Sequence, residues 1–317
     1  MVDGPTKAVI VTGADSNYFG MLRGLLRSLA PVEALKIVFD FGLTPEQRSE
    51  IARFGVEVVR FSYPHDFPAR RQVEETFPGF GAMLVRPHLD QIVPTGHDII
   101  VWIDADAWVQ DPSCLNELAD PAARGAVSMI PEIDRSYIKF RAAYRNWELE
   151  RRSNELCLGR EVGEGLHLAP VLNSGVFATH RASPLWGHWR RRLQEGLQRH
   201  QVIDKENRVI EQASFNAAIC LDGVDVCRFP TTYNWMACLS LPAWDVAQQM
   251  FIDPNPPHNR IRILHLSTHI RDNPVPMPLT IEGRDRILAM FRKKPERNLR
   301  PWPPVQRPFR VRKGGGK

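Results

Sequence analysis

Two aspartates two positions apart, Asp104 and Asp106, are the residues of this sequence best placed to do chemistry. They follow Ile99–Ile103, an apolar run that predicts a buried strand. Alternate side chains of an extended chain point to the same side, so we expect both carboxylates to point together and Ala105 to point away. Two buried carboxylates repel each other, and a bound divalent cation removes that repulsion. The pattern therefore predicts a metal site, with a strand end carrying two solvated aspartates as the alternative.

The segments around this pair alternate between strand-like and helix-like over residues 1–130. Apolar runs rich in β-branched residues predict strands, while helical spacing or a capping pattern such as Thr44–Gln47 predicts helices. The expected strands are Lys7–Thr12, Leu35–Asp40, Val56–Phe61, Ile99–Ile103 and Ala126–Ile130, and the expected helices are Met21–Leu29, one that begins at Thr44, Ala82–Val93 and one that follows Asp111. This alternation predicts an α/β fold with a mixed, mainly parallel sheet covered by helices on both faces. Such sheets bind ligands at the carboxyl ends of their strands, where Asp104 lies.

The alternation becomes irregular after residue 130. The expected helices are Tyr137–Leu156, Leu185–His200 and Val209–Leu221, and the expected strands are Asn173–Thr179, Val224–Phe229 and Ile261–Leu266. Proline-rich stretches then mark loops and a tail that cannot continue helices or central strands. We therefore expect one large domain with two halves, residues 1–130 and 131–272, followed by a proline-rich basic tail, residues 273–317.

The composition excludes several classes of protein. Hydrophobic residues make up 43% and charged residues 24% of the chain, as in globular proteins, and no apolar run reaches the length of about 18 that predicts a membrane span. The five cysteines form no CxxC pair, which argues against a disulfide framework and a zinc ribbon. Polar residues interrupt the first apolar stretch, which argues against a signal peptide. We therefore expect a cytoplasmic protein.

The net charge of +5 comes from the tail. From Arg292 onward ten cations face a single acid, Glu296, so the rest of the chain is net negative. A nucleic-acid-binding protein would carry a basic face on its folded domain, and we expect no nucleic-acid partner. The tail interleaves its cations with Phe291, Trp302 and Phe309, and one interpretation is peripheral contact with the anionic inner face of a membrane. A disordered, solubilising tail is the alternative.

The segment VWIDADAWVQDP, residues 101–112, resembles the aspartate-x-aspartate segment of nucleotide-sugar-dependent glycosyltransferases with the GT-A fold, most like glycosyltransferase family 8. Weaker similarities, in the family's order, extend from about Ala8 to His269. The resemblance implies a Mn²⁺ or Mg²⁺ ion held by Asp104, Asp106 and a histidine from a late strand. His265 takes that position, His269 competes with it, and an ordinary buried histidine is the alternative.

The first strand and its loop, AVIVTGADSNY at residues 8–18, resemble the family segment that holds the nucleotide. The resemblance implies donor contacts from Thr12, Ala14, Asp15, Asn17, Tyr18, Arg86, Asp104, Ala105 and Asp106. Tyr18 could stack on a base whose edge Asp15 or Asn17 reads, and an ordinary Asx turn is the alternative. Arg86 could contact a phosphate or the acceptor, or lie on a helix surface. The sequence lacks the glycine patterns of dinucleotide folds and P-loops.

Two further segments, Leu172–Phe177 and Glu211–Asn216, resemble the parts of the family that lie beside the acceptor and the transferred sugar. The resemblance implies catalytic roles for Asn173, Glu211 and Gln212. Because Glu211 is expected near a helix N-terminus, we expect its carboxylate to stay ionised. The family has aspartate in place of Glu211, and an ordinary acid at the start of a helix is the alternative. The family's diphosphate-binding lysine is missing, and Arg271 could replace it.

The resemblance implies a metal-dependent hexosyltransferase that uses a nucleotide-sugar donor, with UDP favoured, and retains the anomeric configuration. Its acceptor would be a hydroxyl group of a saccharide, a lipid-linked molecule or a small molecule. Residues 1–130 would bind the nucleotide sugar, and residues 131–272 would bind the acceptor and carry the catalytic residues. Two alternatives are a catalytically inactive sugar-nucleotide-binding module and a sugar-1-phosphate nucleotidyltransferase, although the glycine-rich signature expected of the latter is absent.

Overall fold

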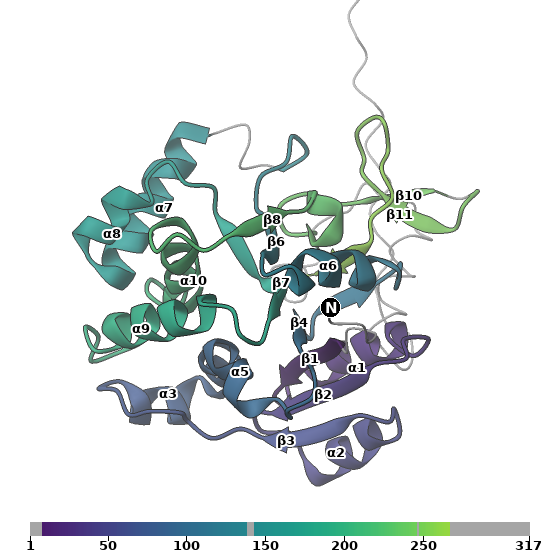
Figure 1. Ribbon diagram of the computed structural model, residues 1–317, viewed down its shortest axis with the longest axis horizontal. Helices are drawn as coiled ribbons and strands as arrows, with labels where there is room; N and C mark the ends of the chain where they lie inside the picture. Colours follow the sequence, from purple (N-terminus) through teal and green to yellow (C-terminus); the bar gives the residue numbers. More distant parts are fainter. Residues whose placement is uncertain (1–7, 138–142, 246, 267–317) are drawn as a thin grey trace, which may run out of the picture.

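The computed structural model describes residues 8–137, 143–245 and 247–266, and its centre is a seven-stranded sheet (Figure 1). The strand order is β3-β2-β1-β4-β7-β6-β8. Neighbouring strands are parallel from β3 to β4 and between β6 and β8, whereas β7 is antiparallel to both β4 and β6. The strands are β1 Ala8–Ala14, β2 Leu35–Asp40, β3 Glu57–Arg60, β4 Ile99–Ile103, β6 Val127–Pro131, β7 Leu172–His180 and β8 Val226–Arg228. The predicted mixed, mainly parallel sheet is confirmed.

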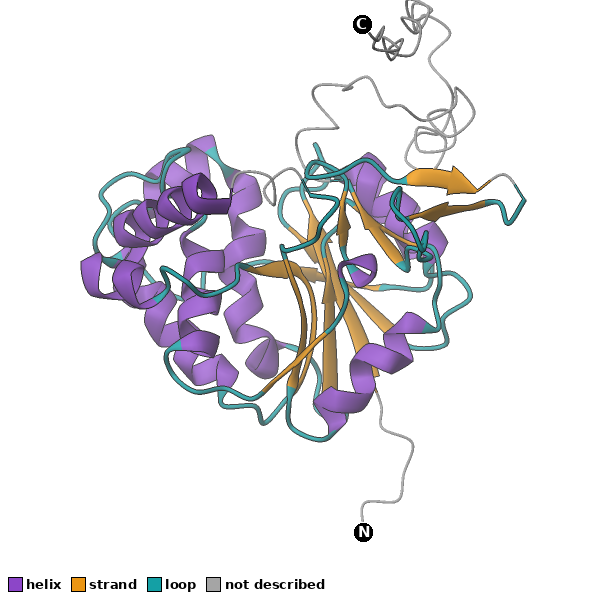
Figure 2. Cartoon of the chain, turned by 90° about the horizontal axis from the view of Figure 1, so that it is seen from above, coloured by secondary structure: helices purple, strands orange, loops and turns teal. Residues whose placement is uncertain are grey.

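Helices cover both faces of this sheet (Figure 2). On one face Trp186 and Trp189 of α9 pack on Phe177 of β7, with ring centroids 6.2 and 5.6 Å away. On the other face Leu25 of α1 and Leu118 of α6 share an apolar cluster with residues of β4. The helices are α1 Phe19–Ser28, α2 Pro45–Ala52, α3 Arg70–Thr76, α4 Gly81–Val85, α5 Leu89–Ile92, α6 Cys114–Ala123, α7 Ala143–Leu158, α8 Arg160–Gly165, α9 Leu185–Leu197 and α10 Ile210–Cys220. This packing fixes the strand ends at which the candidate site lies.

The helix predicted at Ala82–Val93 is interrupted. Helix α4 ends at Val85, a 3₁₀ turn, η2, covers Arg86–His88, and α5 begins at Leu89. Pro87 causes the break, because proline has no backbone N–H and its ring crowds the preceding turn of a helix. The interruption gives Arg86 a place in the buried interior instead of on a regular helix.

Three very short strands form a second sheet beside the main one, and the sequence predicted only one of them. Strand β5 (Ala107–Val109) is antiparallel to β12 (Ile263–His265), which is parallel to β9 (Trp235–Met236). The register sets His265 opposite Ala107 and Met236. An ion pair between Asp111 and Arg262 ties the end of β5 to the start of β12. The second sheet thus joins three segments that lie far apart in the sequence.

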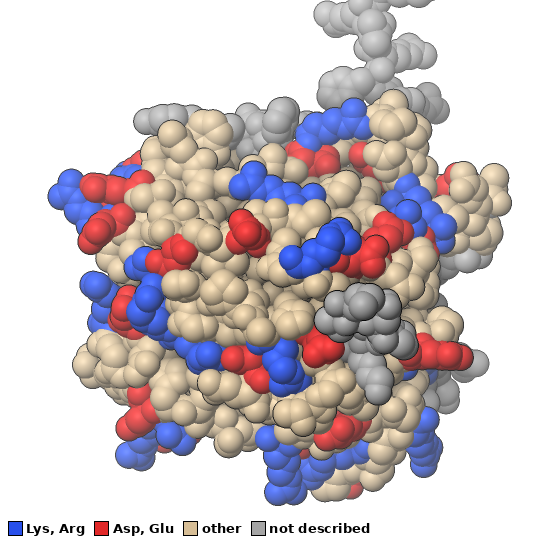
Figure 3. All heavy atoms as spheres, in the orientation of Figure 1, with Lys and Arg blue, Asp and Glu red and all other residues tan. Residues whose placement is uncertain are grey.

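The remaining described parts add little to the site. Strands β10 (Ala243–Asp245) and β11 (Met250–Ile252) form a hairpin at the edge of the molecule, and η1 (Pro78–Phe80) and η4 (Thr231–Tyr233) are 3₁₀ turns. Lysine and arginine side chains are interspersed with acidic ones over the face shown in Figure 3. Within the described ranges, no helix is both long and apolar enough to cross a bilayer. The basic tail, residues 273–317, lies outside the described residues.

Candidate functional site

A tight turn, not an extended strand, brings the two aspartates together. The carbonyl oxygen of Asp104 accepts a hydrogen bond from the N–H of Ala107 at 3.0 Å, so the chain makes a tight turn between β4 and β5. The expectation of strand-like alternation was therefore wrong, although both carboxylates do reach the same site. Ala105 does face another way, since it is buried in an apolar cluster with Ala14 and Leu22.

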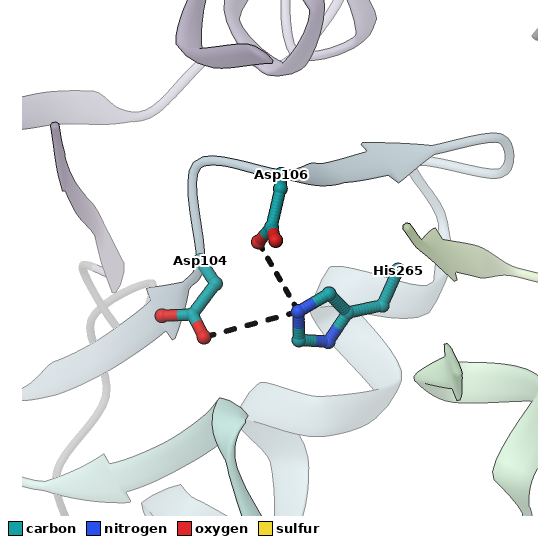
Figure 4. A group of neighbouring side chains, drawn as sticks. All are labelled: Asp104, Asp106 and His265. Carbon is teal, nitrogen blue, oxygen red and sulfur yellow. Dashed lines mark ion pairs between the residues drawn. The ribbon is translucent and has the colours of Figure 1, made fainter. Parts of the chain in front are cut away.

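His265 completes the site from β12 (Figure 4). Its Nε2 lies 3.1 Å from Oδ1 of Asp106 and 3.9 Å from Oδ2 of Asp104. One ligand atom from each of the three residues lies within 4.8 Å of the others, a spacing that suits a shared divalent ion. His269, the competing histidine, lies outside the described residues. The predicted Asp104, Asp106 and His265 are thus brought together.

Space beside this triad depends on Gly175 of β7. A β-carbon at this position would lie 2.7 Å from Oδ2 of Asp104 and 2.7 Å from Cε1 of His265, closer than real side-chain carbons approach. The carbonyl oxygen of Gly175 accepts a hydrogen bond from the N–H of Asp104 at 2.8 Å, so the backbone of β7 lies directly against the turn. The chain therefore keeps open a small space that oxygen and nitrogen ligands face. This arrangement fits a bound cation.

The charges of the triad depend strongly on one another. Burial raises the pKa of Asp104, although the neighbouring Arg86 opposes this shift. Burial alone would also raise the pKa of Asp106, but the ring of His265 outweighs burial and lowers it. Burial would lower the pKa of His265, yet Asp106 and Asp104 together raise it. The imidazole is thus held next to two acids whose repulsion a cation or a proton must relieve.

Arg86 is a buried counter-ion rather than a residue of a helix surface. Its Nη2 donates to Oδ1 of Asp104 at 2.6 Å, and its Nη1 donates to Glu211 at 3.0 Å and to Ser174 at 2.8 Å. The guanidinium also lies over the ring of Trp102, 5.1 Å from its centroid. Arg86 therefore links the aspartate turn to the start of α10. Whether it also contacts a donor phosphate stays a prediction.

Glu211 is only 2% exposed and lies behind Arg86. Its Oε2 accepts hydrogen bonds from Arg86 and from Ser174, whereas its Oε1 has no hydrogen-bond partner among the described residues. Burial raises the pKa of Glu211 to about 7, and the charge of Arg86 only partly offsets this shift. The expectation that the helix N-terminus keeps this carboxylate ionised is therefore not supported, because desolvation outweighs the helix dipole.

Asn173 and Gln212 both donate hydrogen bonds to Glu132, a carboxylate that the sequence analysis did not single out. Nδ2 of Asn173 donates to Glu132 at 2.9 Å, and Nε2 of Gln212 donates to the same oxygen at 3.2 Å. Glu132 lies one residue beyond β6, and together with Gln212 it lines a hollow of about 370 Å³. It lies in no recognisable motif, and its two partners are 41 and 80 residues away. Two of the three predicted catalytic residues therefore share a carboxylate at the edge of this hollow.

A second hollow, of about 230 Å³, adjoins the triad at the carboxyl ends of β1 and β4. Seven of the predicted donor-site residues line it, namely Ala14, Asp15, Tyr18, Arg86, Asp104, Ala105 and Asp106. Thr12 and Asn17 do not line it, because Thr12 is buried within β1 and Asn17 is exposed on the following loop. Oδ1 of Asp15 accepts a hydrogen bond from the N–H of Tyr18 at 2.9 Å, so the Asx turn is present. Asp15 lines the hollow even so.

Comparisons with known proteins bear on the fold. No protein-family model matches the sequence, and no curated protein is significantly similar to it. Among solved structures, the galactosyltransferase LgtC in complex with donor and acceptor sugar analogues is similar with a TM-score of 0.52 at 16% identity, over 89% of this chain and 94% of that chain.

Two further structures agree with this result. The bifunctional glycosyltransferase WbbM is similar with a TM-score of 0.52 at 10% identity, over 92% of this chain and 52% of that chain. The apo form of the glycosyltransferase GlyE from Streptococcus pneumoniae has a TM-score of 0.50 at 16% identity, over 90% of this chain and 60% of that chain. Membership of glycosyltransferase family 8 stays a prediction, whereas the architecture is established: this chain has the GT-A fold of nucleotide-sugar glycosyltransferases.

Proposed function

We propose that this protein is a metal-dependent glycosyltransferase that moves a hexose from a UDP-linked donor to a hydroxyl group of an acceptor. The observation that carries the proposal is the convergence of Asp104, Asp106 and His265 at the strand ends, beside a hollow lined by Asp15 and Tyr18. The similarity to LgtC, which was solved with donor and acceptor sugar analogues, supports it. Sugar transfer requires both kinds of ligand to meet at one site.

Asp104, Asp106 and His265 would hold the metal ion. Two carboxylates and one imidazole, completed by diphosphate oxygens, favour Mn²⁺, and Mg²⁺ would also fit. When bound, the ion would neutralise negative charge that develops on the departing nucleoside diphosphate. The space that Gly175 leaves beside Asp104 and His265 supports this assignment.

The donor would lie in the hollow next to the aspartate turn. Tyr18 offers an aromatic face for a base, and Asp15 offers a carboxylate oxygen for the polar edge of that base. Phe41, Phe77 and Met83 give the hollow apolar walls. Thr12 and Asn17 would act only by shaping the strand and loop that hold these residues.

Glu211, Gln212 and Asn173 would act on the transferred sugar and the acceptor. Arg86 donates hydrogen bonds to both Glu211 and Asp104. One hydrogen-bond network would therefore hold the carboxylate beside the sugar and, through Asp104, the ion that activates the donor. Glu132, which accepts hydrogen bonds from both Asn173 and Gln212, would accept the proton of an acceptor hydroxyl bound beside them. Retention of the anomeric configuration is proposed from the resemblance to family 8 alone. The contacts described above do not bear on it.

The acceptor would be a saccharide, a lipid-linked molecule or a small molecule. We infer from the sequence that the enzyme works in the cytoplasm, and that its basic tail contacts the inner face of the membrane. A lipid-linked acceptor would agree with such contact, because attachment at a membrane brings the site to its substrate.

The decisive experiment is a panel of UDP-sugars incubated with Mn²⁺ and mixed hydroxyl acceptors, with UDP release and glycosylated product both measured. Native protein should release UDP, chelation should stop the release, and Asp104→Asn should lower the rate by at least about 100-fold. Asp222→Asn is the matched control, because Asp222 pairs with Arg191 and Arg192 elsewhere on the fold.

The same panel separates the alternatives. An inactive binding module would bind UDP-sugars without releasing UDP above background. A nucleotidyltransferase would form pyrophosphate from UTP and a sugar 1-phosphate. Full UDP release by the Asp104→Asn variant in the presence of chelator would contradict the proposed function.

A further inference from the structure

Asn234 lies between the candidate metal ligand His265 and the candidate catalytic residue Asn173, and its role is not implied by the sequence. It is 1% exposed and lies directly before β9, the strand that pairs with β12. Its Oδ1 lies 2.9 Å from Nδ1 of His265, and its Nδ2 donates to Oδ1 of Asn173 at 2.8 Å. The three side chains therefore form one buried hydrogen-bonded chain.

The direction of each hydrogen bond that links Asn173, Asn234 and His265 is fixed by one backbone N–H group. The N–H of Gly175 donates to Oδ1 of Asn173 at 2.9 Å, and a backbone N–H can only donate. At its other end Asn173 donates from Nδ2 to the carboxylate of Glu132, which fixes the orientation of its amide. Asn234 must then present its own Nδ2 to Asn173 and its Oδ1 to His265. An amide oxygen can only accept, so Nδ1 of His265 carries a proton.

This arrangement decides which nitrogen of His265 is free for a ligand. Nε2 faces the aspartates, at 3.1 Å from Asp106 and 3.9 Å from Asp104. Without an acceptor at Nδ1, the strongest acceptor for a ring proton would be the carboxylate of Asp106, which would hold that proton on Nε2. A protonated Nε2 has no lone pair for a metal ion. When the ring is neutral and holds a single proton, Asn234 thus competes with Asp106 for the position of that proton.

We propose that Asn234 is a positioning residue that keeps the proton of His265 on Nδ1 and leaves Nε2 to bind a divalent ion. The inference rests on the proposed function, because it places that ion among Asp104, Asp106 and His265. Partners of this kind hold histidine ligands in one tautomer, and their loss lowers metal affinity by about 10–100-fold. The same series of hydrogen bonds continues through Asn173 to Glu132 and Gln212. Hydrogen bonds therefore connect the histidine whose tautomer Asn234 sets to the proposed acceptor side of the site.

The test compares Asn234→Leu with Asn207→Leu in the full-length protein. Asn207 is also a buried asparagine, and among the described residues its side chain bonds only to the backbone at Val202 and Asp204. Two quantities are measured: the Mn²⁺ dissociation constant, from electron paramagnetic resonance of free Mn²⁺, and the Nδ1–H signal of His265 in the metal-free protein, from ¹H–¹⁵N NMR. Native protein should show a protected Nδ1–H. Asn234→Leu should lose this signal and bind Mn²⁺ about 10–100-fold more weakly, whereas Asn207→Leu should change neither.

A second variant, Asn234→Asp, keeps an oxygen facing Nδ1 and serves if the leucine variant does not fold. It should retain the Nδ1–H signal. An unprotonated Nδ1 in the native protein, or native Mn²⁺ affinity in a folded Asn234→Leu variant, would overturn the inference. If the native protein bound no Mn²⁺ but its Nδ1–H signal disappeared in Asn234→Leu alone, Asn234 would keep its positioning role and the metal of the proposed function would be rejected.

Discussion

Arg86 donates a hydrogen bond to Asp104 at 2.6 Å while its other terminal nitrogen donates to Glu211 at 3.0 Å. One buried guanidinium is therefore shared between a candidate metal ligand and the acid at the start of α10. An arginine suits this place because its planar fork reaches two acceptors in fixed directions, which a lysine cannot reproduce.

Replacement of Arg86 by methionine should leave Asp104 and Glu211 without their shared counter-ion. We expect the free energy of unfolding to fall by about 3–5 kcal/mol, because one partner of a buried ion pair is removed. We expect kcat/KM for UDP-sugar turnover to fall by about 100-fold or more, since the turn loses its orientation. Urea unfolding and a UDP-release assay measure the two effects. Arg48→Met, which removes a more exposed partner of Asp40, should cost about 1 kcal/mol or less and leave kcat/KM unchanged.

Gly175 is predicted to tolerate no side chain. In Gly175→Ala the new methyl group would lie within van der Waals distance of Asp104 and His265 and should displace one of them. We expect Mn²⁺ affinity to fall by about 10–100-fold and the free energy of unfolding to fall by about 1–3 kcal/mol. Gly187→Ala is the matched control, because nothing lies within 4 Å of a β-carbon at Gly187 and alanine favours helix α9. Unchanged Mn²⁺ binding in Gly175→Ala would show that the ion does not bind beside this glycine.

The acid at position 211 should make stability depend on pH. Glutamate ionises near 4.5 in the unfolded chain, whereas burial raises the pKa of Glu211 to about 7 in the fold. Between these values the folded state holds a proton that the unfolded state has lost, so stability falls as the pH rises from 4.5 to 7.

Glu211→Gln removes this dependence. We expect the variant to match native stability at pH 4.5 and to exceed it by about 2–3 kcal/mol at pH 8, while its glycosyl transfer is lost. Urea unfolding at the two pH values measures the difference. A stability gain that is the same at both pH values would show that Glu211 titrates as it does in water.

The basic tail gives a prediction that concerns residues outside the described part of the chain. Full-length protein should sediment with vesicles that contain anionic lipids at low salt, and a truncation after Ala289 should not, because electrostatic attraction needs the tail's cations. High salt should release the full-length protein. Equal partitioning of both forms at low salt would dispose of membrane contact through the tail.

The strands of the main sheet and the aspartate pair could be predicted because each is encoded locally. The apolar run at Ile99–Ile103 and the capping box at Thr44 and Gln47 appear in the structure where the sequence places them. The orientation of Arg86 could not be predicted by the same means. It depends on the break that Pro87 makes in a helix whose apolar spacing continues through it.

The supporting side chains of the site were harder still to foresee. Asn234 and Glu132 lie at the ends of short elements with no periodic pattern, and their partners are 31 to 80 residues away. Strands β5 and β9 span three and two residues, too few for any alternation to be read. Their existence depends on pairing with β12, which is a property of the assembled chain.

The late position of β12 has a consequence for how the protein is made. The aspartate turn is translated early, but the imidazole that faces it is supplied by His265, at the end of the last strand described. A nascent chain that has exposed the whole seven-stranded sheet therefore still lacks one corner of its reactive centre. Under the proposed function, activity would begin only after residue 265 has left the ribosome, because His265 supplies one of the three proposed metal ligands.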